Sequence, residues 1–128
     1  MAFWLKLKPQ ERVIIDGASL RNGRSRVELF IENEVPVLRE PDILEPGSAR
    51  TPCERIHLAL QLVYIDAAHR LDHLETYRAL IAEAVKAIPS CRPLIAAIDE
   101  CVRAGRIYQA IRNTRPLRNH ERELTSHA

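Results

Sequence analysis

The sequence has few glycines, few cysteines and no strong excess of either charge, and each shortage excludes a class of function. Only four of its 128 residues are glycine, and none of them forms a loop that could cradle phosphates. The three cysteines are an odd number, and no pair has the two-residue gap of a zinc or redox motif. The formal net charge of +2 is too small to indicate nucleic-acid binding by overall charge alone.

Long apolar runs are also absent. The apolar stretch at residues 2–5 is too short for the core of a signal peptide. No run of 18 apolar residues, the length that spans a membrane as a helix, occurs in the sequence. The cysteines are expected to be buried thiols, as in a protein of a reducing compartment. Together these features predict a cytoplasmic protein without a membrane segment.

Apolar and polar residues alternate through the first 50 residues, which predicts β-strands. In the first expected strand, Phe3, Leu5 and Leu7 share one face, and Trp4, Lys6 and Lys8 share the other. Further short strands are expected over 12–15, 19–21, 25–32 and 35–39. The pairs Asp16-Gly17 and Asn22-Gly23 are turn signals. This half therefore predicts a small antiparallel sheet or barrel.

Helical spacing begins after a boundary rich in proline, residues 41–52. Thr51, Pro52 and Glu54 form a good helix start, with a threonine N-cap and a glutamate three residues later. Helices are expected over about 51–69, 71–88 and 90–105, and a last one from about 106. Pro116 should kink or break the last helix. The chain is thus predicted to be an α+β protein, with a β-rich unit at 1–50 and three or four helices at 51–128 that pack on it.

Signals for an enzyme or a metal site are poor. His69 and His73 could meet on one helix face, with Asp66 and Asp72 nearby, but no third ligand with sensible spacing is evident. The alternative for His69 and His73 is a polar helix end with exposed histidines. His57 lies beside apolar neighbours, so we expect a partly buried packing residue and not a catalytic one. Since no nucleophile motif occurs either, we predict no catalytic residues, no metal and no cofactor.

Two groups of basic residues are candidate contacts. Trp4, Lys6 and Lys8 on one strand face could stack bases and pair with phosphates of a single strand, and Arg24 and Arg26 could widen that patch. The alternative is that Trp4 packs under a helix while the lysines are solvated. Near the C-terminus, Arg112, Arg115 and Arg118 could contact phosphates or an acidic partner, or could be an ordinary solvated helix face.

The order and spacing of several segments resemble the FlbT family over about residues 3–124. They include Leu5-Lys6-Leu7-Lys8-Pro9, Glu11 to Ala18, Leu29 to Glu32, Pro36 to Glu40, Leu58 to Tyr64 and Tyr108-Gln109-Ala110. Two positions depart from the family pattern. Gln10 stands at a turn where a glycine is expected, and Pro116 interrupts an expected continuous helix.

The FlbT resemblance implies regulation of flagellin synthesis after transcription. Proteins of this family act on the 5′ untranslated leader of flagellin mRNA, and they work with a second small protein, FlaF. The sign of the effect differs between members, and repressor is the commoner label. We therefore expect the flagellin mRNA leader, a FlaF-like protein and flagellin itself as candidate partners.

The N-terminal half also resembles, over a shorter stretch, the carbon storage regulator CsrA. Glu11 to Gly17 is similar to its second strand, and Val37-Leu38-Arg39-Glu40 with Ile43 is similar to the end of its last strand. The resemblance implies an RNA contact by Arg39 and an interlocked homo-oligomer. Arg39 also suits the chemistry, because its planar fork can stack on a base or pair with a phosphate. The alternative is a salt bridge to Glu40 or Asp42.

Two functions are compatible with these observations. In the first, the sheet binds the mRNA leader directly, and Arg39→Ala should weaken binding while the far-UV circular dichroism stays unchanged. In the second, the helical half binds FlaF or flagellin, and the effect on the mRNA is indirect. The small net charge favours the second function, since RNA affinity depends on excess positive charge.

Overall fold

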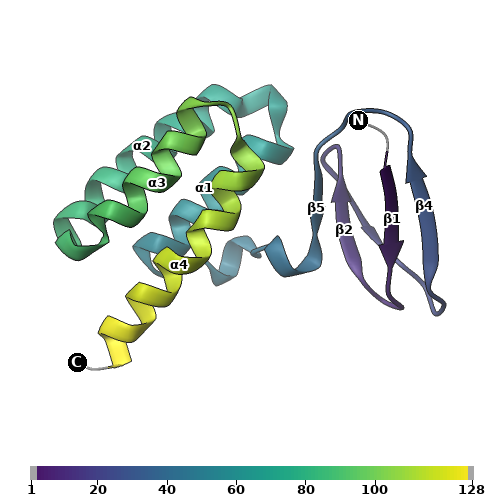
Figure 1. The fold of residues 1–128 in the computed structure, drawn as a ribbon, viewed down its shortest axis with the longest axis horizontal. Coiled ribbons are helices and arrows are strands. Elements are labelled where there is room, and N and C mark those ends of the chain that lie inside the picture. Colours follow the sequence, from purple (N-terminus) through teal and green to yellow (C-terminus); the bar gives the residue numbers. More distant parts are fainter. Residues whose placement is uncertain (1–2, 127–128) are drawn as a thin grey trace. The chain divides into compact units, whose positions relative to one another are not determined.

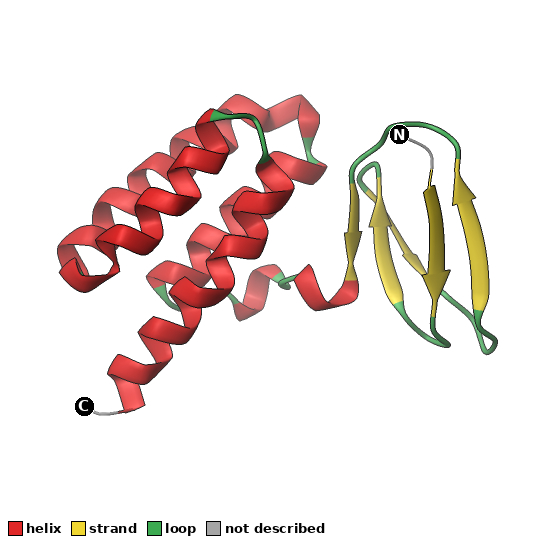
Figure 2. Ribbon diagram, in the orientation of Figure 1, coloured by secondary structure: helices red, strands yellow, loops and turns green. Residues whose placement is uncertain are grey.

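The computed structural model describes residues 3–126 and divides into two compact units, Met1–Ile43 and Leu44–Ala128. The strands lie in the first unit and the α-helices in the second (Figure 2). This order confirms the predicted α+β class. The units separate between Ile43 and Leu44, whereas the sequence suggested residue 50.

Five short strands build two small antiparallel sheets in the first unit. They are β1 (Phe3–Leu7), β2 (Arg12–Ile15), β3 (Ala18–Arg21), β4 (Val27–Ile31) and β5 (Val37–Arg39). Strand β1 pairs with β4, while β2 lies between β3 and β5 (Figure 1). The described strands thus form open sheets and no closed barrel.

The alternation in β1 and β4 sorts their side chains onto two faces. On the inner face, Leu5 and Leu7 are buried with Val13 of β2, and Val27 and Ile31 of β4 pack against them. The register sets Trp4 opposite Phe30 and Lys6 opposite Glu28, and all four of these side chains are exposed on the other face. Because side chains alternate along a strand, burial of the apolar set fixes this outer face.

The Asp16-Gly17 signal is confirmed as the turn between β2 and β3. Both residues have positive φ, 51° and 86°, as a two-residue hairpin turn requires. The second signal begins a longer loop, because β3 and β4 belong to different sheets. There the Asn22 side chain donates hydrogen bonds to the carbonyls of Lys8 (2.8 Å) and Ser25 (2.9 Å).

Gln10 adopts the left-handed conformation that a glycine would favour, with φ 64°. Its N–H donates to the carbonyl of Gly23 (2.9 Å), and its own carbonyl accepts from Nη1 of Arg21 (2.8 Å). We expect Gln10→Gly to raise the free energy of unfolding by about 0.5–1 kcal/mol, because relief of strain exceeds the added freedom of the unfolded chain. Urea unfolding followed by Trp4 fluorescence measures this, since Trp4 is the only tryptophan.

Gln10→Ala is the control for this substitution, because it removes the side chain and keeps the Cβ atom. The alanine variant should stay close to the wild type. Equal midpoints for the glycine and alanine variants would contradict the explanation by backbone strain.

Four α-helices form the second unit, as the sequence predicted. They are α1 (Pro52–Ile65), α2 (Arg70–Ala87), α3 (Arg92–Arg103) and α4 (Ile107–Ser126), with short 3₁₀ turns at Glu40–Asp42, Pro46–Ser48, Ala67–His69 and Pro89–Cys91. Helix α1 packs against α2 and α4, and α3 packs against α4 (Figure 1). Their shared core includes Ile56, Leu60, Tyr77, Ile98 and Leu117. None of the helices in residues 3–126 has the length and hydropathy needed to cross a membrane.

The predicted start of α1 is confirmed. The Thr51 hydroxyl accepts from the N–H of Glu54 (3.2 Å), and the Glu54 carboxylate accepts from the N–H of Thr51 (3.1 Å). Pro52 occupies the first turn, where its missing N–H costs no hydrogen bond. This reciprocal capping fixes where the helical unit begins.

Pro116 was expected to kink or break the last helix, and the break does not occur: α4 continues through Pro116 to Ser126. Thr114 and Leu117 on either side are fully buried, so packing holds both halves of the helix in place. The Thr114 hydroxyl also donates to the carbonyl of Ile111 (2.6 Å). Tertiary packing thus offsets the cost of a proline inside a helix, about 3 kcal/mol.

All three cysteines are free thiols, but the expectation that all are buried holds only for Cys53 and Cys91. Burial is the main cause that raises the pKa of Cys53 to about 12, followed by the nearby Glu121 carboxylate. Burial also raises the pKa of Cys91. Neither thiol is a nucleophile at neutral pH. Cys101 is half-buried and accepts a hydrogen bond from Asn113 (3.5 Å).

Candidate nucleic-acid interface

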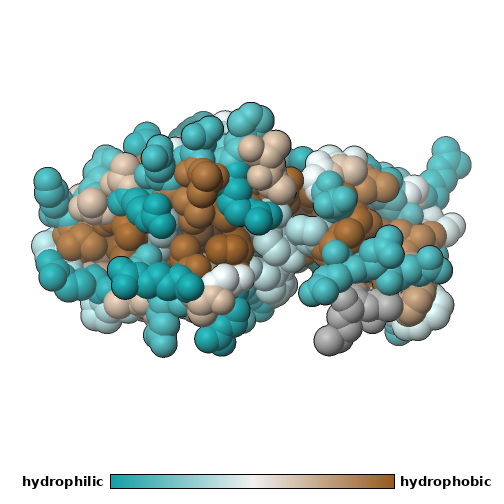
Figure 3. All heavy atoms as spheres, turned by 90° about the horizontal axis from the view of Figure 1, so that it is seen from above, coloured by the Kyte–Doolittle hydropathy of each residue, from teal (hydrophilic) through white to brown (hydrophobic). Residues whose placement is uncertain are grey.

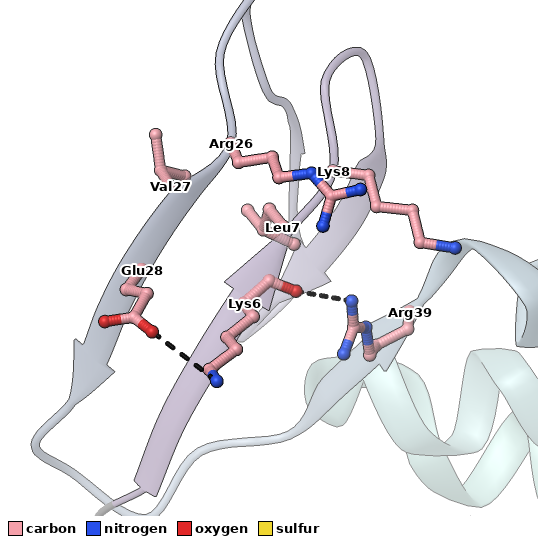
Figure 4. A pocket seen from close by; sticks show the side chains of 7 residues that line it. All are labelled: Lys6, Leu7, Lys8, Arg26, Val27, Glu28 and Arg39. Carbon is pink, nitrogen blue, oxygen red and sulfur yellow. Dashed lines mark hydrogen bonds and ion pairs between the residues drawn. The ribbon is translucent and has the colours of Figure 1, made fainter.

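An open pocket of about 440 Å³ lies on the sheet unit and gathers most of its predicted contacts. Its lining consists of Lys6, Leu7, Lys8, Arg26, Val27, Glu28 and Arg39 (Figure 4). The cations come from three places in the chain: β1 and the turn after it, the loop before β4, and β5. We call this feature the basic pocket. It concentrates four positive charges and one negative charge in a chain whose overall net charge is only +2.

Trp4 and Arg24 lie outside the lining of the basic pocket. Trp4 packs against Phe30 across the strands, with ring centroids 4.9 Å apart and an interplanar angle of 53°. The contact leaves Trp4 63% exposed and Phe30 47% exposed. An exposed aromatic pair on a sheet offers a stacking surface to an unpaired base. Arg24 is exposed in the loop between β3 and β4.

The side chain of Arg39 in β5 contacts two residues near the start of the chain, Lys6 and Glu11. Its Nε and Nη2 donate to the Glu11 carboxylate at 2.9–3.2 Å. Nη2 also donates to the carbonyl of Lys6 (2.5 Å), as Figure 4 shows. The ion pair is therefore made with Glu11, 28 residues away, and not with the neighbours Glu40 or Asp42. Nη1 of Arg39 takes no part in these bonds.

The Glu11 carboxylate accepts the hydrogen bonds of Arg39, and its side chain is only 8% exposed. Its Oε1 accepts from the N–H of Lys8 (2.9 Å), and this bond and then the Arg39 guanidinium hold its pKa below the ordinary 4.5, although burial acts in the opposite direction. The carboxylate is consequently ionised at neutral pH, and it links Lys8, which follows β1, to Arg39 of β5. It also neutralises part of the positive charge at one side of the basic pocket.

The other cations of the basic pocket are less constrained. Nζ of Lys6 lies 3.7 Å from Oε1 of Glu28, and the two side chains are 78% and 58% exposed. An exposed pair at this distance contributes little to stability. Lys8 and Arg26 form no ion pair with another of the described residues, so their charges are open to a ligand.

The three C-terminal arginines differ in their exposure. Arg112 and Arg115 are exposed on α4, while Arg118 is half-buried. Arg118 lines a smaller pocket of about 270 Å³ beside Glu54 and Glu121 at the start of α1. All three arginines interact with other groups of the protein. They are weaker candidates for a phosphate surface than the basic pocket.

The histidines at the start of α2 converge on one carboxylate. Nδ1 of His69 and Nε2 of His73 lie 3.2 Å and 2.9 Å from Oδ2 of Asp66. Hydrogen bonds from His73 and then His69 lower the pKa of Asp66. Within the part of the chain that the structure describes, no group of three or more His, Cys, Asp or Glu side chains is placed to hold a metal ion. His57 is buried inside α1.

Sequence reasoning missed three residues that shape this surface. Glu28 and Phe30 belong to the polar face of the expected strand, so alternation could have placed them opposite Lys6 and Trp4. That step requires the pairing of β1 with β4, which no local signal gives. Glu11 has no local signal either, because its partner Arg39 lies far along the chain.

Comparison with known proteins identifies the chain's relatives. A profile of the family described as "Flagellar protein FlbT" matches residues 3–125. "Probable flagellum biosynthesis repressor protein FlbT 1" of Bradyrhizobium diazoefficiens is 40% identical over 97% of this chain and 85% of its own. "Probable flagellum biosynthesis repressor protein FlbT" of Rhodopseudomonas palustris is 36% identical over 98% of this chain and 99% of its own.

A relative from a third genus extends this agreement. "Flagellum biosynthesis repressor protein FlbT" of Caulobacter vibrioides is 30% identical over 99% of this chain and 92% of its own. No solved structure matches the fold. The similarity therefore runs through both the sheet unit and the helical unit.

Proposed function

The chain belongs to the FlbT family of flagellar proteins, and on that premise we propose that it represses flagellum biosynthesis by binding the 5′ untranslated leader of flagellin mRNA. The names of its relatives describe repressors of flagellum biosynthesis. The observation that supports RNA as the target is the basic pocket, which lies beside an exposed aromatic pair. Binding would block ribosome access or expose the message to nucleases, and neither outcome requires covalent chemistry.

The proposed contacts are of two kinds, ion pairs with phosphates and stacking on a base. Lys8, Arg26 and Nη1 of Arg39, which takes no part in the bonds to Glu11 and Lys6, would bind phosphates, while Trp4 and Phe30 would stack an unpaired base. Lys6, which lies opposite Glu28, connects the two parts. Single-stranded RNA is bound in this way by other sheet surfaces that combine cations with exposed aromatics. The small net charge of the chain is no obstacle, because the relevant charge is local.

If Lys8 and Arg26 contact phosphates, their removal should change the salt dependence of leader binding. We expect the double variant Lys8→Gln/Arg26→Gln to weaken binding of flagellin leader RNA by about tenfold or more near physiological salt. The negative slope of log K against log salt should become shallower by about 1.4, since each lost phosphate contact removes about 0.7 from its magnitude on a single strand. Fluorescence anisotropy of labelled leader RNA over a salt series measures both quantities.

The matched control is Arg78→Gln/Lys86→Gln, which removes the same charges from exposed positions on α2. This variant should keep both the affinity and the slope of the wild type. If the two double variants lose affinity equally, binding follows overall charge and the basic pocket is not the site.

A second candidate function is partner binding through the helical unit, and exposed apolar side chains favour it. Leu71 is 78% exposed, Leu124 45% and Tyr108 38%, and Figure 3 shows apolar areas on the visible face of this unit between polar ones. A FlaF-like protein or flagellin would be the partner, and RNA binding would then require it. Formation of a homo-oligomer through the sheet unit stays a prediction, which sedimentation of the purified protein tests.

A further inference from the structure

The outer face of β1 and β4 carries two cross-strand pairs in succession. Lys6 lies opposite Glu28, and Trp4 lies opposite Phe30 two residues further along. Side chains two residues apart on a strand share a face and are separated by about 7 Å. A charged pair and an aromatic pair thus stand side by side, on strands whose opposite face is fixed by the core.

Glu28 is the unexpected member of this surface. It is the only acidic residue that lines the basic pocket, where a carboxylate repels the phosphates that the four cations attract. Its ion pair with Lys6 is long, 3.7 Å, and highly exposed, so it adds little to stability. Figure 4 shows its second carboxylate oxygen directed away from Lys6. A carboxylate in such a place is suited to accept hydrogen bonds from a ligand.

We infer that Lys6 and Glu28 together read the Watson–Crick edge of one unpaired guanine, beside a neighbouring base stacked on Trp4 and Phe30. This inference rests on the proposed RNA binding and names what the same surface recognises. A lysine next to a carboxylate presents one donor followed by two acceptors. Guanine offers the complement, with the O6 acceptor followed by the N1–H and N2–H donors.

The other bases complement this pair less completely. Adenine offers the N6–H donor beside the N1 acceptor, and cytosine offers the N4–H donor beside the N3 and O2 acceptors. Either base can form a bond to each side chain, but neither can make a bidentate contact with the carboxylate. Uracil would place its O2 acceptor against a carboxylate oxygen. The predicted order of preference is therefore guanine first and uracil last, and it is set by Glu28, not by the cations.

The test uses the full chain and single-stranded oligouridine RNAs of about 12 nucleotides that carry one central variable base. With guanine at that position, the wild type should bind about tenfold more tightly than with uracil, the effect of one good bidentate contact. Inosine, which lacks the N2–H donors, should lose most of this gain, and 7-deazaguanine, which keeps the Watson–Crick edge, should retain it.

In Glu28→Gln the preference for guanine should fall to within about twofold, because an amide presents only one acceptor. Binding to the uracil RNA should be unchanged or stronger, since a negative charge is removed. The charge-matched control Glu75→Gln, at an exposed position of α2, should keep the tenfold preference. Urea midpoints of both variants establish that the sheet unit remains folded.

The possible outcomes distinguish failure of the guanine preference from failure of the proposed RNA binding. Equal binding of guanine and uracil RNAs by the wild type overturns the inference and leaves RNA binding intact. A uniform gain of affinity for every RNA in Glu28→Gln also overturns it, because Glu28 would then act only as a repelling charge. Failure of the wild type to bind any of these RNAs or the leader at low salt overturns both.

Discussion

Replacing Arg39 with alanine should lower the free energy of unfolding of the sheet unit by about 2 kcal/mol. The substitution leaves the Glu11 carboxylate, 8% exposed, without its guanidinium partner and removes the bond to the carbonyl of Lys6. A fully buried pair would cost more, but Arg39 itself is 41% exposed and water relieves part of the loss. Urea unfolding followed by Trp4 fluorescence measures the change.

The lowered pKa of Glu11, held down first by the Lys8 N–H and then by the Arg39 guanidinium, gives the wild type a dependence on pH. The folded-state pKa of Glu11 is lowered from 4.5, so at acidic pH the unfolded chain binds a proton more readily than the folded chain. The stabilisation is therefore present above about pH 4.5 and is lost as the pH falls through the lower folded pKa. In Arg39→Ala this loss of stability at acidic pH should be smaller, because only the N–H and the ammonium group of Lys8 still favour the carboxylate.

Arg39→Lys is the informative control, since it keeps the charge and loses the planar fork. It should recover part of the stability of the wild type. A urea midpoint for Arg39→Ala equal to that of the wild type would contradict the structural role. RNA binding by Arg39→Ala must be measured where the variant is fully folded, because unfolding of the sheet unit would also weaken binding.

Glu121→Ala should destabilise the helical unit by about 2–3 kcal/mol. Glu121 of α4 is buried and caps the start of α1, where Oε1 accepts from the Thr51 hydroxyl (2.5 Å) and Oε2 from the N–H of Cys53 (3.3 Å). Its removal leaves a helix N–H and a hydroxyl without their acceptor and takes a negative charge from a helix N-terminus. Thermal unfolding followed by circular dichroism at 222 nm reports on this unit.

Glu123→Ala is the matched control, because Glu123 is exposed two residues further along the same helix. It should stay within about 0.5 kcal/mol of the wild type. Glu121→Gln, which keeps an acceptor and the shape, should lie between the two. If the alanine variants at positions 121 and 123 unfold together, the contact with Thr51 and Cys53 does not stabilise the protein.

Local rules were sufficient for the elements of this fold. Alternation located the strands, Asp16-Gly17 located the hairpin turn, and Thr51 with Glu54 located the start of α1. Each of these signals involves residues within a few positions of one another. The departure at Gln10 likewise marked a real feature, because that residue has positive φ.

Sequence rules that consider only neighbouring residues could not predict contacts between residues far apart in the chain. The Arg39–Glu11 pair spans 28 residues and the Thr51–Glu121 contact spans 70. Both depend on how strands and helices pack. Pro116 shows the same limit, since packing of Thr114 and Leu117 preserves a helix that local preference would end.

The candidate site was predictable in part for the same reason. Lys6, Lys8, Arg26 and Arg39 were identified by residue type and by resemblance, and the structure gathers them in the basic pocket. Glu28 and Phe30 complete that surface only because β4 pairs with β1. The acid and the aromatic that give the surface its proposed selectivity are thus products of strand pairing.

Direct binding of the flagellin mRNA leader to the purified full chain, measured by gel shift without and with a FlaF-like protein, tests this account most directly. The account expects a shifted complex with the chain alone, weakened steeply by salt and by Lys8→Gln/Arg26→Gln. A complex that forms only when the FlaF-like protein is present, and that is indifferent to the basic pocket, would contradict it.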